Sequence, residues 1–227
     1  MKLLALDTSS EACSVAICSN GKIFESHFIE AKSHNRVLLP AIMAMLEAAE
    51  LTMDNIESIV LGIGPGSFVG MRIGASVAQG LAFASKINII PVSSMETIAL
   101  EIMLTHNLCE IVVMQNARMN ELYIGEYKLS PDGLTKIVTP IKLSSISEGI
   151  REYSNQKRNI VGIGFLENSD NFPSLQTNVK LNKELGYPKA SYLIKLAEQK
   201  YCISSALKPE ELILDYIRQE VALKPKA

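Results

Sequence analysis

The sequence predicts an α/β protein of two lobes, in which mixed sheets are flanked by helices. The chain has 227 residues and 48% hydrophobic composition, which is enough for one large core or two smaller ones. Short strand-like stretches alternate with apolar helical runs in the first half, and the second half opens with a similar series of three strands. No segment is repeated in sequence, so the two lobes are inferred from the order of elements.

The first half predicts the order β-β-β-α-β-α-β-α. An Asn-Gly pair at 20–21 is a strong signal for a two-residue hairpin between the second and third strands. Ser33 offers an N-cap to the first helix, which runs to about residue 51, and Ser93 with Glu96 forms a capping box before the third helix. The predicted strands are 2–7, 12–19, 22–28, 59–63 and 87–92, and the second helix spans about 71–85.

The second half predicts three strands, a helix, a further strand and two helices. The predicted strands are 110–115, 121–129, 134–143 and 159–163, and the helices are 147–153, 189–201 and 210–218. We expect lobes at 1–100 and 101–209, and a C-terminal helix and tail at 210–227 that packs back on the first lobe. Two lobes that each begin with a three-stranded meander are typical of actin-like ATPases, the ASKHA or ribonuclease H-like fold.

Charge and composition exclude several classes of protein. The net charge of −2 and the pI of about 6.0 do not fit a protein that binds nucleic acid through an overall basic field. The late lysines alternate with glutamates, which favours a solvated helix face over an RNA-binding patch. The four cysteines form no C-x-x-C pair, no leader precedes the first strand, and no apolar run is long enough to span a bilayer. We therefore expect a cytoplasmic protein with no membrane partner.

Two segments are candidates for facing a nucleotide. Asp7 ends a buried strand and is followed by a turn of small hydroxyl residues. In actin-like folds a residue at this position holds a metal-bound water, and the turn approaches phosphate. Alternatively, Asp7 and Ser9 only cap a tight turn. The glycine-rich loop 64–70 could bring backbone amides to an anion, or could only permit close packing. It matches neither a Walker A loop nor a dinucleotide fingerprint, and Ser67 lacks the context of a nucleophile. The candidate residues are Asp7, Thr8, Ser9, Gly64, Gly66 and Ser67.

The first two helices of the first lobe are unusually apolar. Residues 37–46 carry no charge, and the second helix is rich in Gly and Ala, with Arg72 and Gln79 as its only large polar groups. Either both are core helices, or one lobe cannot hide them and they form a surface for a partner. Met43 and Met45 suit an adaptable interface. The candidate interface residues are Leu38, Leu39, Ile42, Met45, Leu46, Met71, Arg72, Ala75, Val77, Ala78 and Leu81.

Metal chemistry has little support in the sequence. His27, His34 and His106 are the only histidines, and none has a second histidine four residues away. We therefore expect no metal site in this chain.

Several motifs together resemble the bacterial TsaB family, also called YeaZ. They are Leu-Ala-Leu-Asp-Thr-Ser-Ser at 4–10, Leu-Leu-Pro at 38–40, Gly-Pro-Gly-Ser-Phe-Val-Gly-Met-Arg-Ile-Gly at 64–74, Asn-Ala-Arg-Met-Asn-Glu-Leu-Tyr at 116–123 and Tyr-Ile-Arg at 216–218. The resemblance covers the whole chain. Val69 stands where the family usually has Thr, Asn116 where Asp is usual, and Leu214 where Pro is common, which argues against chemistry by the first two side chains.

The resemblance implies two actin-like lobes and a role in tRNA modification. Members pair with the related catalytic subunit TsaD through the first two helices, and the ATPase TsaE joins them. The complex transfers a threonylcarbamoyl group to N6 of adenosine 37 in tRNAs that read ANN codons. TsaD carries an H-x-x-x-H metal pair, whose positions align near Ala117 and Glu121 here.

Three functions are candidates for this chain. The first is a non-catalytic scaffold that has no cofactor of its own, with ATP or ADP and Mg bound at the level of the complex and tRNA contacted indirectly. This scaffold would form a homodimer through the same helices when the partner is absent. The second is a nucleotide-binding ASKHA enzyme with its own ATPase or transferase activity, using Asp7 and the loop 64–70. The third is a metalloprotease, against which the missing histidine pair argues.

Overall fold

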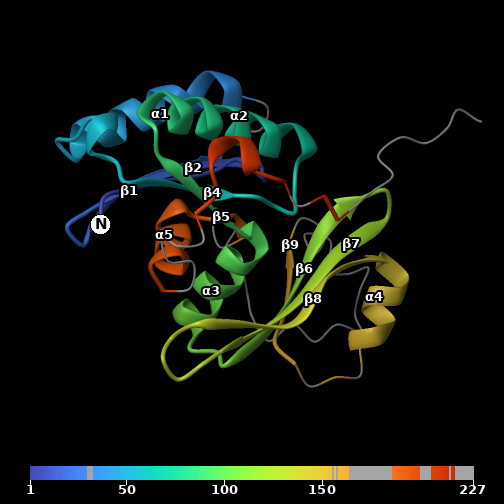
Figure 1. Ribbon diagram of the computed structural model, residues 1–227. Coiled ribbons are helices and arrows are strands. Elements are labelled where there is room, and N and C mark those ends of the chain that lie inside the picture. The colour runs from blue at the N-terminus through green and yellow to red at the C-terminus, as the bar shows by residue number, and fades with distance from the viewer. Residues whose placement is uncertain are drawn as a thin grey trace, which may run out of the picture.

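The computed structural model describes residues 1–29, 33–154, 156, 158–163, 186–199, 206–214 and 216–217 of the chain. Within these residues the helices and sheets stack in alternating layers (Figure 1). Helices α1 (His34–Ala48) and α2 (Phe68–Ser85) form the first layer. The first sheet follows, then α3 (Ser94–His106) and α5 (Ala190–Gln199), then the second sheet, and finally α4 (Ile146–Tyr153).

The first sheet has the strand order β3-β2-β1-β4-β5. Its central strand β1 pairs antiparallel with β2 and parallel with β4. Because both faces are covered by helices, every residue of β1 and β4 is buried, as expected of central strands in a sheet of this kind. The strands are β1 (Leu3–Asp7), β2 (Ala12–Ser19), β3 (Lys22–Ile29), β4 (Ser58–Gly62) and β5 (Asn88–Val92), and a short 3-10 helix, η1 (Met53–Asn55), precedes β4.

The alternation of side chains along β1 places two separate cores on the two faces of this sheet. Leu4 and Leu6 belong to the cluster formed with α1 and α2. Leu3 and Ala5 point the other way, into the cluster formed with α5. Successive apolar residues of the strand contribute to opposite clusters, so burial on both faces fixes the register of the sheet.

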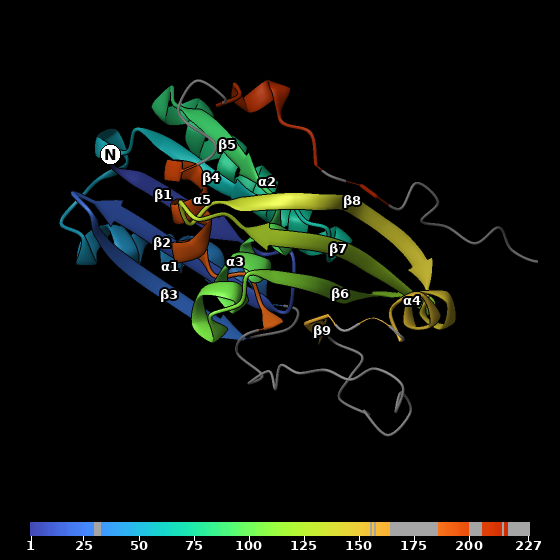
Figure 2. The same cartoon turned by 90° about the horizontal axis from the view of Figure 1, so that it is seen from below.

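The second sheet has the order β8-β7-β6-β9, which repeats the first four positions of the first sheet (Figure 2). Again the first strand of the lobe pairs antiparallel with the second and parallel with the fourth. Its strands are β6 (Glu110–Arg118), β7 (Glu121–Leu129), β8 (Thr135–Ser145) and β9 (Ile160–Ile163). This repeated topology confirms the two-lobed actin-like fold that the sequence predicts.

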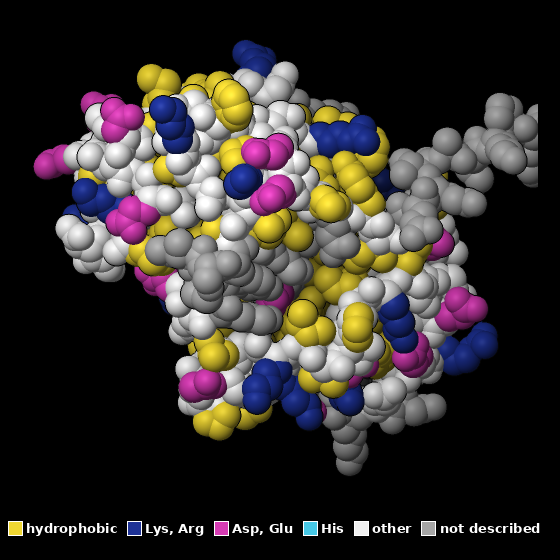
Figure 3. All heavy atoms as spheres, viewed as in Figure 1, with side chains coloured by type: hydrophobic (Ala, Val, Ile, Leu, Met, Phe, Trp, Pro, Cys, Tyr) yellow, Lys and Arg dark blue, Asp and Glu magenta, His cyan; other side chains and the backbone are white. Residues whose placement is uncertain are grey.

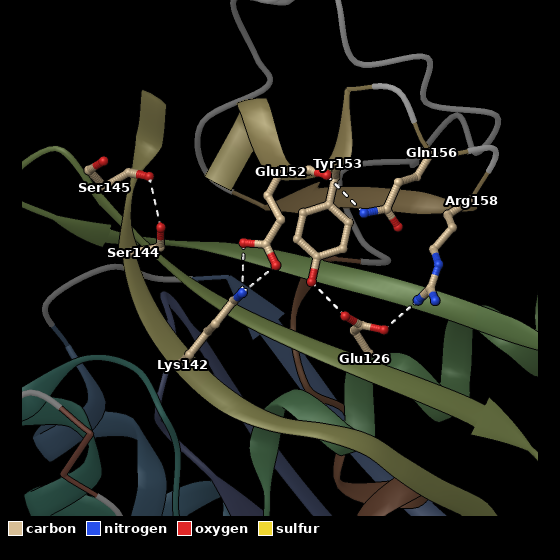
Figure 4. Close-up of polar contacts among 8 residues, drawn as sticks. All are labelled: Glu126, Lys142, Ser144, Ser145, Glu152, Tyr153, Gln156 and Arg158. Atoms are coloured by element: carbon tan, nitrogen blue, oxygen red, sulfur yellow. Dashed lines mark hydrogen bonds and ion pairs between the residues drawn. The ribbon is translucent and has the colours of Figure 1, made fainter. Parts of the chain in front are cut away.

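A polar network attaches α4 to the outer face of the second sheet. The Glu126 carboxylate on β7 accepts a hydrogen bond from the Tyr153 hydroxyl at 2.6 Å and pairs with the Arg158 guanidinium (Figure 4). Lys142 on β8 donates to Glu152 on α4 at 2.6 Å. Burial alone would raise the pKa of Glu126, but the hydrogen bonds from Tyr153 and Arg158 outweigh it, so the pKa lies below its usual value.

The lobes are more interleaved than the predicted ranges 1–100 and 101–209. The boundary at residue 100 falls inside α3, and α5 packs on the first sheet although it lies within the range assigned to the second lobe. Two side chains of the first sheet hold the start of α5: the Ser14 hydroxyl accepts from the amide of Ala190, and Glu25 accepts from that of Ser191, each at 2.8 Å. These acceptors satisfy helix amides that have no partner within the helix.

The helix predicted over 210–218 is wrong for the residues that the structure describes. Only Pro209–Glu211 form a short 3-10 helix, η5, and Leu212–Leu214 continue without helical structure. Leu212 and Leu214 both pack on the core of the first lobe, while Ile213 between them is 80% exposed. This period of two requires an extended backbone, which the helical reading of the apolar run overlooked.

The helix starts also differ in part from the predictions. Ser33 makes no side-chain cap, whereas Ser67, which was not predicted as a cap, accepts a hydrogen bond from the amide of Gly70. Helix α2 therefore begins at Phe68 and not after Gly70. The cap at Ser93 is confirmed, because its hydroxyl accepts from the amide of Glu96. Among the described residues, no helix is long and apolar enough to cross a bilayer.

Candidate functional site

Asp7, at the end of β1, is enclosed by its own chain. Its side chain is fully buried, and one carboxylate oxygen accepts hydrogen bonds from the amide and the hydroxyl of Ser9 at 2.8 and 2.7 Å. The other oxygen accepts from the hydroxyl of Ser94 at 2.6 Å. A Cβ atom at Gly62 would lie 1.8 Å from this second oxygen, so only glycine fits beside it. Burial raises the pKa of Asp7, and the hydrogen bonds from Ser94 and Ser9 offset part of that effect.

The glycine-rich loop packs directly against the turn that follows Asp7. The amide of Ser67 donates to the carbonyl of Ser9 at 2.6 Å, and the hydroxyl of Thr8 donates to the carbonyl of Gly70 at 2.8 Å. Cβ atoms at Gly66 and Gly70 would each lie 2.0 Å from a carbonyl oxygen of this turn. The glycines therefore allow the backbone of the loop to lie close to the backbone of the turn after Asp7. This agrees with the alternative in which the glycines permit close packing.

The structure thus brings the six candidate nucleotide-facing residues together, but their polar groups largely bind one another. Ser94 completes the set: its hydroxyl accepts from the amide of Gly64 at 3.0 Å and donates to Asp7. Sequence reasoning named Ser93 and missed Ser94, because a second serine at a helix start carries no signal of its own. In this arrangement the Asp7 carboxylate has no exposed surface for a metal-bound water.

Potential metal ligands are dispersed over the described parts of the chain. No three His, Cys, Asp or Glu side chains among them are close enough to hold an ion. His34 lies near the Asp7 turn, where its Nε2 atom is 3.0 Å from the carbonyl of Ser10. That contact places His34 as a link between α1 and the turn.

The candidate interface residues on α1 and α2 divide by burial. Five of them are buried within the lobe, so their assignment to an interface needs correction: Leu38, Ile42, Met71, Ala75 and Ala78. Four are partly buried and pack against the same core: Met45, Leu46, Val77 and Leu81. Leu39 and Arg72 are exposed. The apolar character of both helices is therefore used in part for the core, as the alternative reading held.

The outward side of these helices is nevertheless apolar. The four most exposed large hydrophobic side chains in the described chain all lie on α1, α2 or the segment that follows η5: Ile213 (80%), Phe83 (77%), Met43 (69%) and Val69 (64%). Figure 3 shows hydrophobic side chains at the surface over this part of the molecule. Scattered exposed apolar residues are ordinary, but their concentration on one side of one lobe is typical of a protein interface.

The described C-terminal residues complete this side of the first lobe. Leu207 forms a bridge with Ile89 at the edge of the sheet, and the Gln79 amide on α2 donates to the carbonyl of Pro209 at 2.8 Å. The ring of Tyr216 lies 5.6 Å from that of Phe68 at the start of α2. A shallow groove runs between α2 and this segment, lined by Arg72, Ser76, Gln79, Leu212, Leu214 and Tyr216 among others.

Fold and surface together define a class: a two-lobed actin-like protein in which the turn after Asp7 is enclosed and the outward side of α1 and α2 is apolar. Residues 28–157 match the family model described as "TsaD: tRNA N6-adenosine threonylcarbamoyltransferase". The TsaB protein of Haemophilus influenzae is 31% identical over 99% of this chain and 96% of its own length. That of Escherichia coli is 29% identical over 99% and 97%, respectively.

Two solved structures from Pseudomonas aeruginosa agree with these relatives. YeaZ has a TM-score of 0.81 at 27% identity and covers 95% of this chain and 99% of its own. A protein described as similar to peptidase YEAZ has a TM-score of 0.84 at 29% identity, covering 96% and 99%. The chain belongs to the TsaB family. The relatives from H. influenzae and E. coli are tRNA threonylcarbamoyladenosine biosynthesis proteins.

Proposed function

We propose that this chain is a non-catalytic subunit in the biosynthesis of threonylcarbamoyladenosine in tRNA. It holds a TsaD-like catalytic subunit on the outward side of α1 and α2, and a TsaE-like ATPase joins the pair. The assembled complex transfers the threonylcarbamoyl group to N6 of adenosine 37 in tRNAs that read ANN codons. This chain contacts the tRNA indirectly, in keeping with its net charge of −2.

The observation that carries the proposal is the concentration of exposed apolar side chains on one face. Met43 on α1 and Phe83 on α2 are each more than two-thirds exposed, although both helices also supply the core beneath them. Apolar side chains gain free energy when a partner removes them from water, at about 25 cal/mol per Å² of apolar area. A second protein with a complementary apolar surface would supply that burial.

The enclosed Asp7 supports a role without chemistry of its own. A carboxylate that holds a metal-bound water must present an oxygen to it, and both oxygens of Asp7 are engaged by Ser9 and Ser94 in a fully buried position. We therefore assign nucleotide and Mg to the assembled complex. Incubation of the isolated chain with ATP and Mg²⁺ should give no hydrolysis above that of the buffer, and sustained turnover by the pure chain would count against this assignment.

Binding of the TsaD-like subunit from the same organism tests the proposal directly. Met43→Arg places a charge in the apolar surface, and the cost of burying it unpaired should weaken the affinity about 100-fold. Leu104→Arg is the matched control, because Leu104 is an exposed apolar residue on a different helix, α3, and this variant should bind like wild type. No binding by the wild-type chain, or equal loss in both variants, would contradict the proposal.

The same surface should mediate self-association when the catalytic subunit is absent. Light scattering at rising concentration should show a dimer for the wild-type chain and a monomer for Met43→Arg. A wild-type chain that stays monomeric at high concentration would refute the homodimer and leave the heteromeric proposal standing.

A further inference from the structure

The C-terminal strap, residues 206–214 and 216–217, is attached to α2 by contacts along its length. It is joined to the edge of the first sheet by the Leu207–Ile89 bridge and to α2 through Gln79. Leu212 and Leu214 anchor it in the core of the first lobe. The strap is thus held in place by the folded chain, and its outward side chains, Ile213 and Tyr216, are presented in a defined position.

Arg72 lies where α2 and the strap meet, and it is held there by aromatic rings. Its guanidinium stacks 3.6 Å from the ring centroid of Phe68 and 5.8 Å from that of Tyr216. Its Nε atom donates a hydrogen bond to the Tyr216 hydroxyl at 3.1 Å. These contacts fix the planar group before any ligand arrives, so that little side-chain entropy is lost on binding.

The charge of Arg72 has no counterpart within the described residues. The four ion pairs found there involve Lys128, Lys142, Arg158 and Lys189, and none involves Arg72. The guanidinium therefore keeps N–H donors in its fork geometry free for an external acceptor. A carboxylate matches this fork with two parallel hydrogen bonds.

The surroundings of Arg72 indicate what kind of molecule would bring that carboxylate. Val69 stands one turn before Arg72 on α2, and Phe83 lies near the other end of the helix; both are largely exposed, as is Ile213 on the strap. Ile213, which lines the same groove as Arg72 and Tyr216, and the neighbouring Val69 give this end of α2 the composition of a protein-binding hot spot. Phe83 extends the exposed apolar surface toward the other end of the helix. A phosphate backbone would instead be matched by several basic groups, whereas the described strap carries one lysine, Lys208, beside the acidic Glu210 and Glu211.

We propose that the strap and α2 form one composite docking surface, on which Ile213, Phe83 and Val69 receive an apolar surface of the partner and Arg72 pairs with a carboxylate within that surface. This proposal rests on the proposed function, because the partner is taken to be the TsaD-like subunit. It goes further in assigning part of the surface, Ile213, to the C-terminal strap and in requiring an acidic side chain among the apolar side chains of the partner.

The test is the affinity of the purified TsaD-like subunit for strap and arginine variants, measured at low and high salt. Ile213→Ser should weaken binding about tenfold, while Leu104→Ser, its matched control on α3, should not. Arg72→Met keeps an apolar stem and removes the charge; it should weaken binding about tenfold at low salt and abolish the salt dependence. Arg72→Lys keeps the charge without the fork and should fall between Arg72→Met and wild type.

Each outcome decides between the proposals. Full affinity in both Ile213→Ser and Arg72→Met, with loss in Met43→Arg, overturns the composite surface and leaves the proposed function standing. Failure of the wild-type chain to bind overturns both. If Arg72→Met binds the protein normally but weakens the retention of tRNA by the complex, Arg72 pairs with phosphate and the carboxylate assignment is wrong. Thermal unfolding of each variant confirms that it is folded, as the exposure of these side chains predicts.

Discussion

Two glycines of α2 should respond in opposite directions to the same substitution. A Cβ atom at Gly80 would meet nothing within 4 Å, whereas one at Gly70 would lie 2.0 Å from the carbonyl oxygen of Thr8. Both residues lie within the same helix, so the two alanine variants differ chiefly in what surrounds the new methyl group. The comparison isolates the close approach of the glycine-rich loop and the Asp7 turn.

The magnitudes follow from these distances. Gly80→Ala should stabilise the fold by about 0.5–1 kcal/mol, since an unstrained alanine is favoured over glycine inside a helix. At Gly70 the new methyl group is about 1.4 Å closer to Thr8 than ordinary contact allows. Relief of this clash separates the helix from the turn and weakens two hydrogen bonds, Thr8 to Gly70 and Gly70 to Ser67. The expected cost is about 2–4 kcal/mol.

Thermal unfolding followed by circular dichroism measures both effects. For a chain of this length Gly80→Ala should raise Tm by about 2 °C, and Gly70→Ala should lower it by about 5 °C or more. A Gly70→Ala protein as stable as wild type would show that the loop does not press against the turn. A destabilised Gly80→Ala would show that this side of α2 is occupied within the monomer.

Two further predictions concern carboxylates with shifted pKa values. Glu126→Gln should lower the free energy of unfolding at pH 7 by about 1–2 kcal/mol, measured by urea unfolding, because Arg158 loses its charged partner. Since the pKa of Glu126 is lowered on folding, the difference between wild type and variant should shrink as the pH falls below 4.5 through the folded-state pKa. A difference in stability that does not depend on pH would refute this prediction. The stability contribution of Asp7 should change with pH in the opposite direction. Its pKa is raised on folding, so the folded state is favoured most when the Asp7 carboxyl group is protonated. Wild type should therefore gain stability relative to Asp7→Asn as the pH falls from 7 toward 3.8. A wild-type protein that loses stability relative to Asp7→Asn on acidification would contradict the burial of Asp7.

The sequence predicted the fold well where local pattern and burial agree. The hairpin at Asn20-Gly21 and the strands that flank it match the structure, as do the helices on each side of β5. It failed at the C-terminus because Leu212-Ile213-Leu214 suits either a helix or an extended strand when it is read alone. Only the contact of Leu212 and Leu214 with the core of the first lobe decides for the extended form.

The candidate site was predicted at the level of elements and only partly at the level of residues. Apolar composition singled out α1 and α2 as a candidate surface, but it could not tell Ile42, which is buried, from Met43, which is exposed to solvent. The strap was expected to pack on the first lobe, yet its contribution of Ile213 depends on a backbone that the sequence did not specify. Likewise, the sequence singled out Asp7 as a candidate functional residue, but it did not predict that Asp7 is enclosed. The enclosure depends on Gly62 and Ser94, which are distant from Asp7 in sequence.

We propose that this chain supports tRNA modification by binding and not by chemistry, and complementation distinguishes these two roles. In cells depleted of the chain, threonylcarbamoyladenosine in tRNA is measured by mass spectrometry after expression of a variant at matched soluble levels. Asp7→Asn and Leu104→Arg should restore the modification, whereas Met43→Arg should not. A folded Asp7→Asn protein that binds the TsaD-like subunit yet fails to restore the modification would contradict the account, because Asp7 would then take part in the reaction.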